Sequence, residues 1–397
     1  MSKWEEKRLG EVCSFISRGV APQYVENGIE VVNQKCIRNN TVDLKLCRYT
    51  SFEHKITENR FVQYGDVLIN STGTGTLGRT AIFKNSNRRV TVDGHVTIVR
   101  ANHKANGLYI GYLLFSNFTF LENLGCGSTN QLELSTKDIK RIKIQLPPLP
   151  AQRKIADILS AYDDLIENNN RRIELLEQEA QQLYKEWFVR FRFPGYETAH
   201  FTKGIPDGWE VVRLGSIVKI NSKSIDNNYQ FNYINYIDIS SVEQGNILDK
   251  THYAIEQAPG RAKRIITDGD VLWSMVRPNL RAYTIILNPE PNDIASTGFA
   301  VLTPIKVPFS FLYLHVTDNS FVEYLSNYAR GAAYPAVTSA EFEFAKLLLP
   351  PSELLSDFHS HTESLFREAR ILKQQNQNLI KQRDLLLPRL MSGKLEV

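Results

Sequence analysis

Two short stretches of the chain carry the side chains best suited to contacting a polar ligand. Each follows a run of apolar residues that predicts a strand, and each is rich in hydrogen-bond donors. Arginine can bond bidentately to guanine, asparagine to adenine, and serine or threonine to base edges or phosphates, so we interpret both stretches as candidate DNA-contacting loops. A solvated loop with ordinary surface arginines is the alternative. The candidates are Ser71, Thr72, Thr74, Thr76 and Arg79 in the first stretch and Ser274, Arg277, Asn279 and Arg281 in the second.

The first stretch also contains a G-x-G-x-x-G pattern, at Gly73, Gly75 and Gly78, with Asp93 further along the chain. In a dinucleotide-binding fold this pattern opens a helix whose N-terminus faces the pyrophosphate. Here residues 80–84 predict a short strand followed by a turn, and the matching stretch of the second half has no glycine. The pattern therefore does not predict a nucleotide cofactor.

Basic residues outside the two loops could neutralise phosphates, which would add affinity without sequence preference. Any one such cluster is more often plain surface. The clusters are Lys35 with Arg38, Arg88 with Arg89, and Arg261 with Lys263 and Arg264.

Two further stretches are candidate contact loops, because they occupy equivalent positions ahead of two Pro-Pro pairs. One is residues 127–131 and the other contains Tyr334. Plain turns are the alternative for both.

The chain lacks the residue patterns of the common catalytic sites. Its histidines show no H-E-x-x-H or other metal spacing, no serine lies in G-x-S-x-G, and no P-loop for ATP is present. Both Pro-Pro pairs are preceded by leucine, which does not fit an amino-methylation motif. Cys13, Cys36, Cys47 and Cys126 have no C-x-x-C spacing, so structural zinc is not expected. We therefore expect a binding protein without a reaction or a cofactor of its own.

An internal repeat sets the organisation of the chain. Three unrelated short sequence motifs recur at a nearly constant offset of about 204 residues, which is hard to obtain by chance. Each half has about 145 residues of mixed segments, a Pro-Pro pair, and a long segment without interior proline or glycine. The recurring motifs are Trp-x-x-x-x-Leu-Gly at 4–10 and 209–215, Gly-Asp-Val-Leu at 65–68 and 269–272, and Leu-Pro-Pro at 146–148 and 349–351.

The mixed segments predict an α+β fold. Short runs rich in β-branched and aromatic residues, bounded by Gly, Asn and Asp, predict strands at 67–70, 96–99, 233–239 and 282–287. Residues 109–121 and 311–328 fit helical spacing better. We expect globular domains at 1–150 and 205–350, a central helix at 151–192 and a C-terminal helix at 351–397.

The segment after each Pro-Pro pair predicts a long helix with a heptad seam. The first, from residue 153 to about 188, would run roughly 54 Å. A single apolar stripe needs a partner, so the two helices are expected to pack on each other, with Asn169, Asn376 and Arg383 fixing the register. Two independent helices, each lying on its own domain, are the alternative. The expected interface residues are Ile155, Leu159, Tyr162, Ile166, Ile173, Leu176, Leu183, Phe358, Leu365, Leu372, Leu379 and Leu386.

Composition limits the classes of protein to which the chain can belong. With 42% hydrophobic and 23% charged residues, the 397-residue chain has ordinary globular values, which exclude disorder as its main state. No apolar run is long enough to cross a bilayer, and the N-terminus lacks a secretory signal, so we expect a cytoplasmic protein. The net charge of +4 permits nucleic-acid binding without arguing for it.

The repeated plan resembles the DNA specificity subunit of type I restriction-modification systems. Residues 147–159, PPLPAQRKIADIL, and residues 386–395, LLPRLMSGKL, look like the central and terminal conserved regions of that family. The second Pro-Pro pair is followed by Ser352 and lacks the Pro-x-Gln element of the first. The resemblance covers nearly the whole chain.

The resemblance implies two target recognition domains separated by two long antiparallel coiled-coil helices. Such a subunit is non-catalytic and reads a bipartite, asymmetric sequence in double-stranded DNA. Its expected partners are two adenine-N6 methyltransferase subunits and ATP-dependent nuclease (restriction) subunits, which would hold S-adenosylmethionine, ATP and magnesium. A helix of roughly 54 Å reaches over more than one duplex turn of about 34 Å. The alternative function is a protein-interaction scaffold with a coiled-coil spacer and no DNA.

Overall fold

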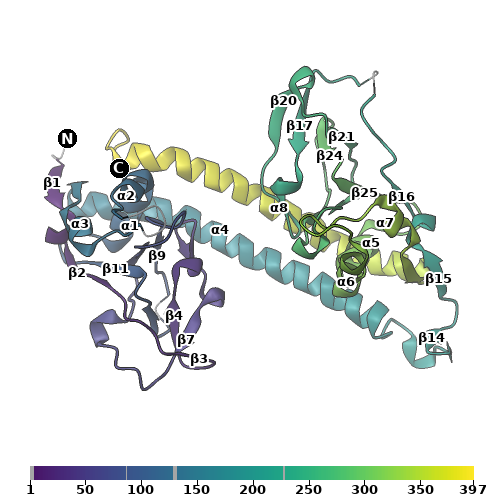
Figure 1. Ribbon diagram of the computed structural model, residues 1–397, viewed down its shortest axis with the longest axis horizontal. Coiled ribbons are helices and arrows are strands. Elements are labelled where there is room, and N and C mark those ends of the chain that lie inside the picture. The colour runs from purple at the N-terminus through teal and green to yellow at the C-terminus, as the bar shows by residue number, and fades with distance from the viewer. Residues whose placement is uncertain (1–3, 86, 128–131, 227–228) are drawn as a thin grey trace. The chain divides into compact units, whose positions relative to one another are not determined.

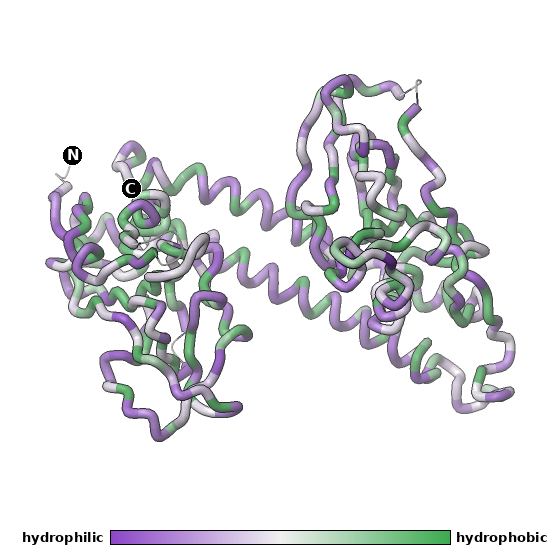
Figure 2. The backbone as a smooth tube through the Cα atoms, in the orientation of Figure 1, coloured by the Kyte–Doolittle hydropathy of each residue, from purple (hydrophilic) through white to green (hydrophobic). Residues whose placement is uncertain are grey.

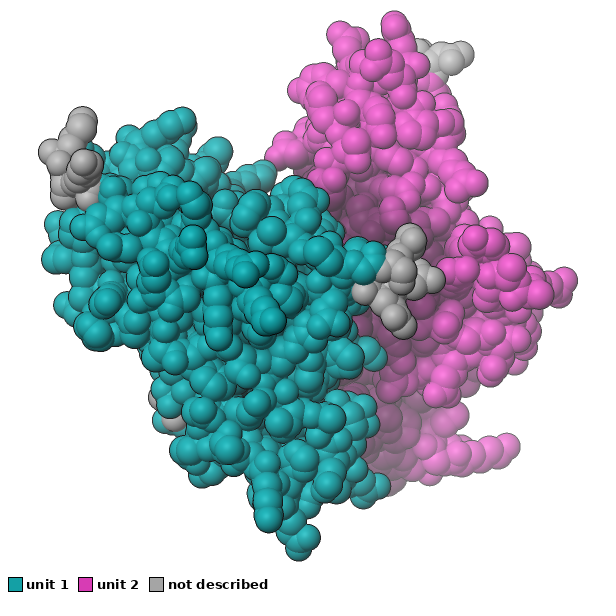
Figure 3. Space-filling model, turned by 60° about the vertical axis from the view of Figure 1, so that its left-hand side comes forward, with its two compact units in different colours: residues 1–168, 376–397 teal, residues 169–375 magenta. Residues whose placement is uncertain are grey.

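The computed structural model describes residues 4–85, 87–127, 132–226 and 229–397, and the chain forms two compact units (Figure 3). Unit 1 comprises Met1–Asn168 and Asn376–Val397, and unit 2 comprises Asn169–Gln375. Each unit therefore contains one copy of the repeat's mixed segments and one part of each long helix. The expected domain boundaries remain predictions, because the compact units divide the chain within the helices.

Unit 1 is built on two four-stranded sheets. The first, in the order β2-β11-β8-β9, is antiparallel, and the second, β10-β4-β7-β3, contains one parallel pair, β10 with β4. Strand β8 has both faces buried, which explains its apolar run of Val67, Leu68 and Ile69. The strands are β1 (Glu5–Arg8), β2 (Cys13–Arg18), β3 (Tyr24–Val25), β4 (Ile29–Val32), β5 (Ile37–Arg38), β6 (Thr41–Val42), β7 (Arg48–Thr50), β8 (Val67–Asn70), β9 (Thr80–Ile82), β10 (Val90–Val92), β11 (Val96–Ala101) and β12 (Lys143–Leu146).

Helices cover one face of the first sheet. Val67 and Ile69 of β8 pack in one cluster with Tyr109 of α1, whereas Leu68 packs in another with Val90 of β10. Unit 1 thus has a helix-facing core and a second core that includes residues of both sheets. The short helices are α1 (Gly107–Ser116), α2 (Phe118–Asn123) and α3 (Thr136–Arg141).

Unit 2 repeats this plan with the sheets β16-β25-β22-β23 and β20-β17-β24-β21. Its helices are α5 (Phe309–Thr317), α6 (Asn319–Tyr328) and α7 (Ser339–Phe344). The strands are β13 (Phe201–Thr202), β14 (Ile205–Pro206), β15 (Glu210–Arg213), β16 (Val218–Ile220), β17 (Tyr233–Ile237), β18 (Val242–Glu243), β19 (Asn246–Ile247), β20 (Thr251–Ala254), β21 (Ala262–Ile265), β22 (Val271–Ser274), β23 (Tyr283–Ile285), β24 (Asp293–Ser296), β25 (Phe299–Pro304) and β26 (Lys346–Leu349).

The predicted strands and helices of the mixed segments are confirmed, with one difference. The two stretches of helical spacing each form two short helices, α1 and α2 in unit 1 and α5 and α6 in unit 2. Asn117 caps α1 and Asp318 separates α5 from α6 in extended conformation, so neither pair continues as one helix. After Gly78 the chain enters strand β9, not a helix.

The first and third recurring motifs of each unit lie side by side because the strands that contain or adjoin them pair with each other. In unit 1, β1 runs antiparallel to β12 with Glu5 opposite Leu146, and in unit 2 β15 pairs with β26 with Glu210 opposite Leu349. The Trp-x-x-x-x-Leu-Gly and Leu-Pro-Pro motifs therefore belong to one two-stranded antiparallel sheet in each unit. In unit 1, Gly393 follows α8 in a left-handed conformation (φ 69°) and lies against the Trp4 ring.

The Gly-Asp-Val-Leu motif spans the turn before the central strand and the first residues of that strand. Gly65 and Gly269 adopt φ of 84° and 85°, a conformation that favours glycine. The following carboxylates accept a backbone N–H three residues earlier, at 2.8 Å for Asp66 and 2.7 Å for Asp270. The repeated aspartate is thus a structural residue in both units.

The two long helices are α4 (Leu149–Tyr184) and α8 (Ser352–Met391), and a π-helical turn (Lys185–Val189) follows α4 (Figure 1). Hydrophilic and hydrophobic residues alternate along both (Figure 2). Every residue of the two predicted seams is buried or half-buried.

Within each unit the helices pack antiparallel. In unit 1, Ile155 and Leu159 of α4 share a cluster with Leu387 and Leu390 near the end of α8. In unit 2 the later part of α4 meets the earlier part of α8, with Ile173 and Leu176 against Ala369 and Leu372. The other expected interface residues are half-buried or buried: Tyr162, Ile166, Leu183, Phe358, Leu365, Leu379 and Leu386.

Two further findings concern the whole described chain. No helix in this part of the chain is both long and apolar enough to cross a membrane. Cys36 and Cys47, which the spacing did not pair, lie with their Sγ atoms 3.9 Å apart as free thiols.

Candidate nucleic-acid interface

The first candidate loop of unit 1 joins β8 to β9 as a closed turn. The N–H of Asn70 donates to the Arg79 carbonyl (2.9 Å), and the N–H of Gly78 donates to the Asn70 carbonyl (2.8 Å). Gly73, Gly75 and Gly78 all have positive φ, so the glycines shape the loop. Thr74 lies exposed between them.

Thr72 is the centre of a hydrogen-bond network on this loop. Gln34 donates from Nε2 to the Thr72 carbonyl and to Thr72 Oγ1, the latter at 2.8 Å. Thr72 Oγ1 also bonds His95 Nδ1 at 2.8 Å. Three segments far apart in the sequence, residues 34, 72 and 95, thus meet at one surface position.

A neighbouring hairpin completes this surface. Cys126 and Glu133 exchange backbone hydrogen bonds, and Glu133 also forms a bridge with Thr72. Arg18 reaches the hairpin through an ion pair to Glu133 (2.7 Å) and a bond to the Leu134 carbonyl (2.9 Å). Of the candidate stretch 127–131, residues 128–131 lie outside the described residues.

The candidate loop of unit 2 joins β22 to β23 and has no glycine. Arg277 (φ 50°, ψ 63°) and Arg281 (φ 57°, ψ 39°) adopt left-handed conformations on either side of a 3₁₀ turn at Pro278–Leu280. Such conformations are costly for a residue with a side chain and persist only where surrounding contacts hold them. The N–H of Arg277 donates to the Pro335 carbonyl at 2.7 Å, which is one such contact.

The half-buried Arg277 and the exposed Tyr334 pack against each other. The Arg277 Cζ atom lies 4.5 Å from the centre of the Tyr334 ring, and its Nη2 donates to the Ala333 carbonyl at 3.2 Å. The Tyr334 side chain is 69% exposed. The structure thus brings together two residues that the sequence proposed separately, from two loops of unit 2.

The remaining candidates on the two loops differ in exposure. Asn279 is exposed, whereas Thr76 and Arg79 are half-buried and bond to carbonyls of their own loop. Arg281 donates to Asn319 Oδ1 at 2.8 Å. Ser71 and Ser274 are fully buried, and their hydroxyls bond to Thr97 and to the Val276 carbonyl, so they build the loops without facing solvent.

The basic clusters also separate into two kinds. Lys35, Arg38 and Lys263 are exposed, and no carboxylate lies within ion-pair distance of them in the part of the chain that the structure describes. Arg264 is half-buried, bonds Ser224 Oγ at 3.3 Å, and has its pKa lowered by burial. Arg261 is exposed.

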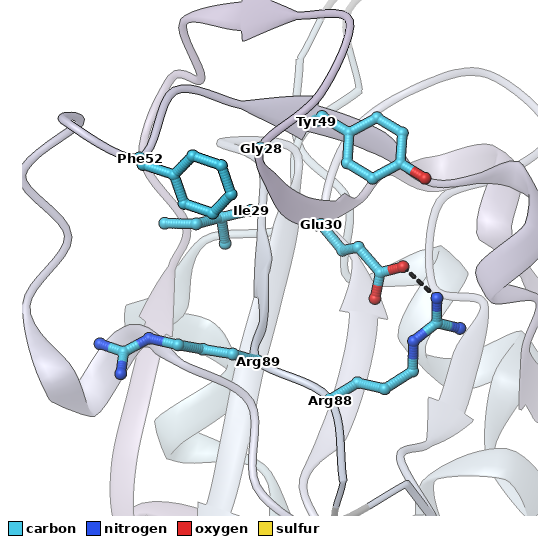
Figure 4. A pocket seen from close by; sticks show the side chains of 7 residues that line it. All are labelled: Gly28, Ile29, Glu30, Tyr49, Phe52, Arg88 and Arg89. Atoms are coloured by element: carbon cyan, nitrogen blue, oxygen red, sulfur yellow. Dashed lines mark hydrogen bonds and ion pairs between the residues drawn. The ribbon is translucent and has the colours of Figure 1, made fainter.

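Arg88 and Arg89 belong to a shallow pocket of unit 1, lined also by Gly28, Ile29, Glu30, Tyr49 and Phe52 (Figure 4). Arg88 is ion-paired with Glu30. Arg89 pairs with Glu58 at 3.0 Å and lies over the Phe61 ring. Because carboxylates already neutralise both, this cluster is the weaker phosphate-binding candidate.

Sequence reasoning missed Gln34 and His95 in unit 1 and Asn319 in unit 2. Each contacts a candidate loop from a distant segment, and nothing in the local sequence marks them. Among the described residues, no group of His, Cys, Asp and Glu could hold a metal ion.

The architecture of this chain is thus a duplicated α+β domain in which each copy is followed by a long helix and carries an unlike polar loop at a matching position. The family model for the type I restriction modification DNA specificity domain matches residues 1–178 and 206–379. The chain therefore belongs to the family of type I restriction-modification specificity subunits, which are non-catalytic.

Relatives agree over nearly the whole chain. The MjaIX specificity subunit of Methanocaldococcus jannaschii is 28% identical, with 87% of this chain and 82% of that protein covered. The HindI specificity subunit of Haemophilus influenzae is 21% identical over the full length of both. The crystal structure of a type I S subunit from M. genitalium has a TM-score of 0.63 at 14% identity and covers 98% of this chain and 96% of that one, which shows the shared fold.

Proposed function

We propose that this chain reads a bipartite, asymmetric DNA sequence, one half with each repeated domain. It would thereby direct adenine-N6 methylation or ATP-dependent cleavage by partner subunits. The observation that carries this proposal is the pair of loops after β8 and β22, which occupy the same position on a duplicated scaffold yet differ in sequence. Threonines and glycines dominate the first loop, whereas the second has Arg277 and Asn279 and no glycine. Two copies of one scaffold that must recognise two different sequences need such loops.

Each unit also carries exposed aliphatic residues on its helices, which support docking of partner subunits. In unit 1, Ile158 and Leu165 lie seven residues apart on α4, and Leu385 of α8 is 66% exposed. In unit 2, Leu175 and Ile371 are more than half exposed. We infer that methyltransferase subunits dock on these helices and cover the exposed aliphatic side chains.

The cofactors follow from this division of labour. S-adenosylmethionine would be held by the methyltransferase subunits, and ATP and magnesium by the nuclease subunits. This chain would supply duplex binding and the placement of its partners on the target.

The experiment that tests the proposal is co-expression with the cognate methyltransferase subunit, followed by base-resolution mapping of N6-methyladenine. We expect the two proteins to copurify and to methylate one sequence with an unread spacer. Replacing residues 1–150 by the same region of a relative should change one half of that sequence only. Failure of both copurification and methylation, or a change in both halves, contradicts the proposal.

Duplex binding separates this function from a protein scaffold that has no nucleic acid. A specificity subunit should bind double-stranded DNA with an affinity that falls steeply as salt rises, because the slope counts phosphate contacts. A scaffold should show no such binding at any salt concentration.

A further inference from the structure

The two candidate loops can be aligned residue by residue from their pairing. In unit 1 an isolated antiparallel β-bridge joins Thr72 of the candidate loop to Glu133. In unit 2 a corresponding antiparallel bridge joins Val276 to Ala336. Thr72 and Val276 each lie two residues after the central strand. Gly73 is therefore the counterpart of Arg277, and both have positive φ, 95° and 50°.

At this matched position the two units present different side chains. Gly73 contributes none, and the Gln34 carboxamide takes the place beside it. A Cβ atom at Gly73 would lie 3.1 Å from Gln34 Nε2 and 3.4 Å from Gln34 Oε1. In unit 2 the matched residue is Arg277, whose guanidinium lies over the Tyr334 ring.

Arg277 is prepared to bind two acceptors. Its backbone is fixed in a left-handed conformation ahead of Pro278, its guanidinium is stacked on an aromatic ring, and one Nη2 proton is bound by the Ala333 carbonyl. No carboxylate pairs with it among the described residues, unlike Arg88, Arg100 and Arg383. A fixed guanidinium with unused donors matches the O6 and N7 acceptors of guanine.

Gln34 is prepared for the opposite role. Its Nε2 donates to both the carbonyl and the hydroxyl of Thr72, which uses its two protons. Within the described part of the chain its Oε1 makes no hydrogen bond, so it remains as an acceptor. An acceptor in the major groove selects a base that carries an exocyclic amine, which is N6 of adenine or N4 of cytosine.

We propose that Gln34 and Arg277 are equivalent specificity-determining residues, which read an amine-bearing base in one half-site and guanine in the other. This inference rests on the proposed function, since it names the base contacts of the same two loops. It assigns Tyr334 the role of a positioning residue that holds the Arg277 plane.

The test maps methylated adenines for the complex of the full chain with its methyltransferase subunit, and compares Arg277→Ala with Arg261→Ala as a matched control. Arg261 is an exposed arginine of the same unit outside the loop. Arg277→Ala should reduce discrimination at a single G·C pair of the half-site read by residues 205–350, by roughly 10-fold or more. Arg261→Ala should lower methylation at all sites alike and leave the sequence unchanged.

Two further variants keep the result interpretable if Arg277→Ala folds poorly. Arg277→Lys retains the charge but lacks the planar fork, so it should relax the same base pair while duplex affinity in low salt stays close to wild type. Gln34→Ala should relax one position in the other half-site, where the preferred base is adenine or cytosine.

The outcomes distinguish a failure of the proposed function from a failure of the base assignment. If the wild-type complex methylates no bipartite sequence, the proposed function fails. If it does, and the Arg277 and Gln34 variants keep the wild-type sequence with only a lower rate, these residues contact phosphates and the base assignment is overturned. Relaxation in the wrong half-site also overturns it.

Discussion

Asp163 of α4 and Arg383 of α8 form an ion pair in the interior of unit 1. Asp163 Oδ1 lies 2.7 Å from Arg383 Nη1, and the two side chains are only 8% and 9% exposed. Asp163 Oδ2 accepts the hydroxyl proton of Tyr112 at 2.5 Å. One carboxylate thus connects both long helices to helix α1 of the globular part of unit 1.

Removing that carboxylate should destabilise unit 1 strongly. In Asp163→Ala, Arg383 keeps only its half-exposed neighbour Asp384 as a counter-charge, at 2.9 Å, and Tyr112 loses its acceptor. The expected cost is about 3 kcal/mol, the lower end of the range for a buried pair broken on one side. Hydrogen exchange of peptides from residues 155–168 and 376–390 measures the effect locally. The control is Arg172→Ala, whose pair with Glu368 is about half exposed and should contribute no more than about 1 kcal/mol. Equal protection in the two variants would contradict this prediction.

His315 should make unit 2 sensitive to acid. Burial lowers its pKa to about 4, and its Nδ1 lies 3.0 Å from the Tyr184 hydroxyl at the end of α4. The unfolded chain takes up a proton near pH 6.5, whereas the folded chain does not, so the stabilisation is complete above pH 6.5 and is lost as the pH falls toward 4. Between pH 7 and pH 5 the loss is about 2 kcal/mol.

The matched comparison isolates this residue from other titrating groups. His315→Asn keeps an acceptor near the Nδ1 position but does not titrate, so its unit 2 stability should depend less on pH than that of wild type. His361→Asn changes an exposed histidine of the same unit and should retain the wild-type dependence. Unfolding in urea at pH 7 and pH 5 measures both. An unchanged pH dependence in His315→Asn would show that another group is responsible.

Gln152 should hold the start of α4 to unit 1. It is 1% exposed, its Nε2 donates to the Pro147 carbonyl at 2.8 Å, and its Oε1 accepts the Asn106 N–H at 2.9 Å. Gln152→Ala removes the partner of the partly buried Asn106 N–H and leaves the buried Pro147 carbonyl unpaired, the latter at about 1–3 kcal/mol. Faster hydrogen exchange at Asn106 and in the first turns of α4 is the expected readout. Gln178→Ala, in the exposed part of the same helix, should change stability by no more than about 0.5 kcal/mol.

The sequence predicted what depends on local periodicity. The seams of α4 and α8 could be found because a heptad repeat marks each buried position, and even the polar seam residues Asn169, Asn376 and Arg383 are buried as expected. Asp163 was not found, since it lies off the seam and its partner Tyr112 is on a helix of the globular part. The loops after β8 and β22 were located by their place after a strand. Their partners Gln34 and His95 depend on the pairing of distant strands, which no local pattern encodes.

Exposed cations that lack carboxylate partners should set the salt dependence of duplex binding. If Lys35 and Lys263 each neutralise one phosphate, replacing either with alanine should reduce the slope of log affinity against log salt by about 0.9. Arg89→Ala is the control, because Glu58 already neutralises that side chain. Binding of the purified chain to duplex DNA, measured at several salt concentrations, provides the slopes. An unchanged slope for both lysine variants would place the phosphate contacts elsewhere.

Leu385 should contribute to the docking of a methyltransferase subunit. It is 66% exposed on α8, whereas its neighbour Leu387 is buried in the core of unit 1, so a change at Leu385 need not disturb the fold. Leu385→Asp places a charge on the proposed contact and should lower the yield of copurified methyltransferase about 10-fold or more, as expected for a central interface residue. Gln382→Asp adds the same charge at an exposed polar position of the same helix and should copurify normally. Because both variants should bind duplex DNA like wild type, equal methyltransferase yields would show that the partner docks on another surface.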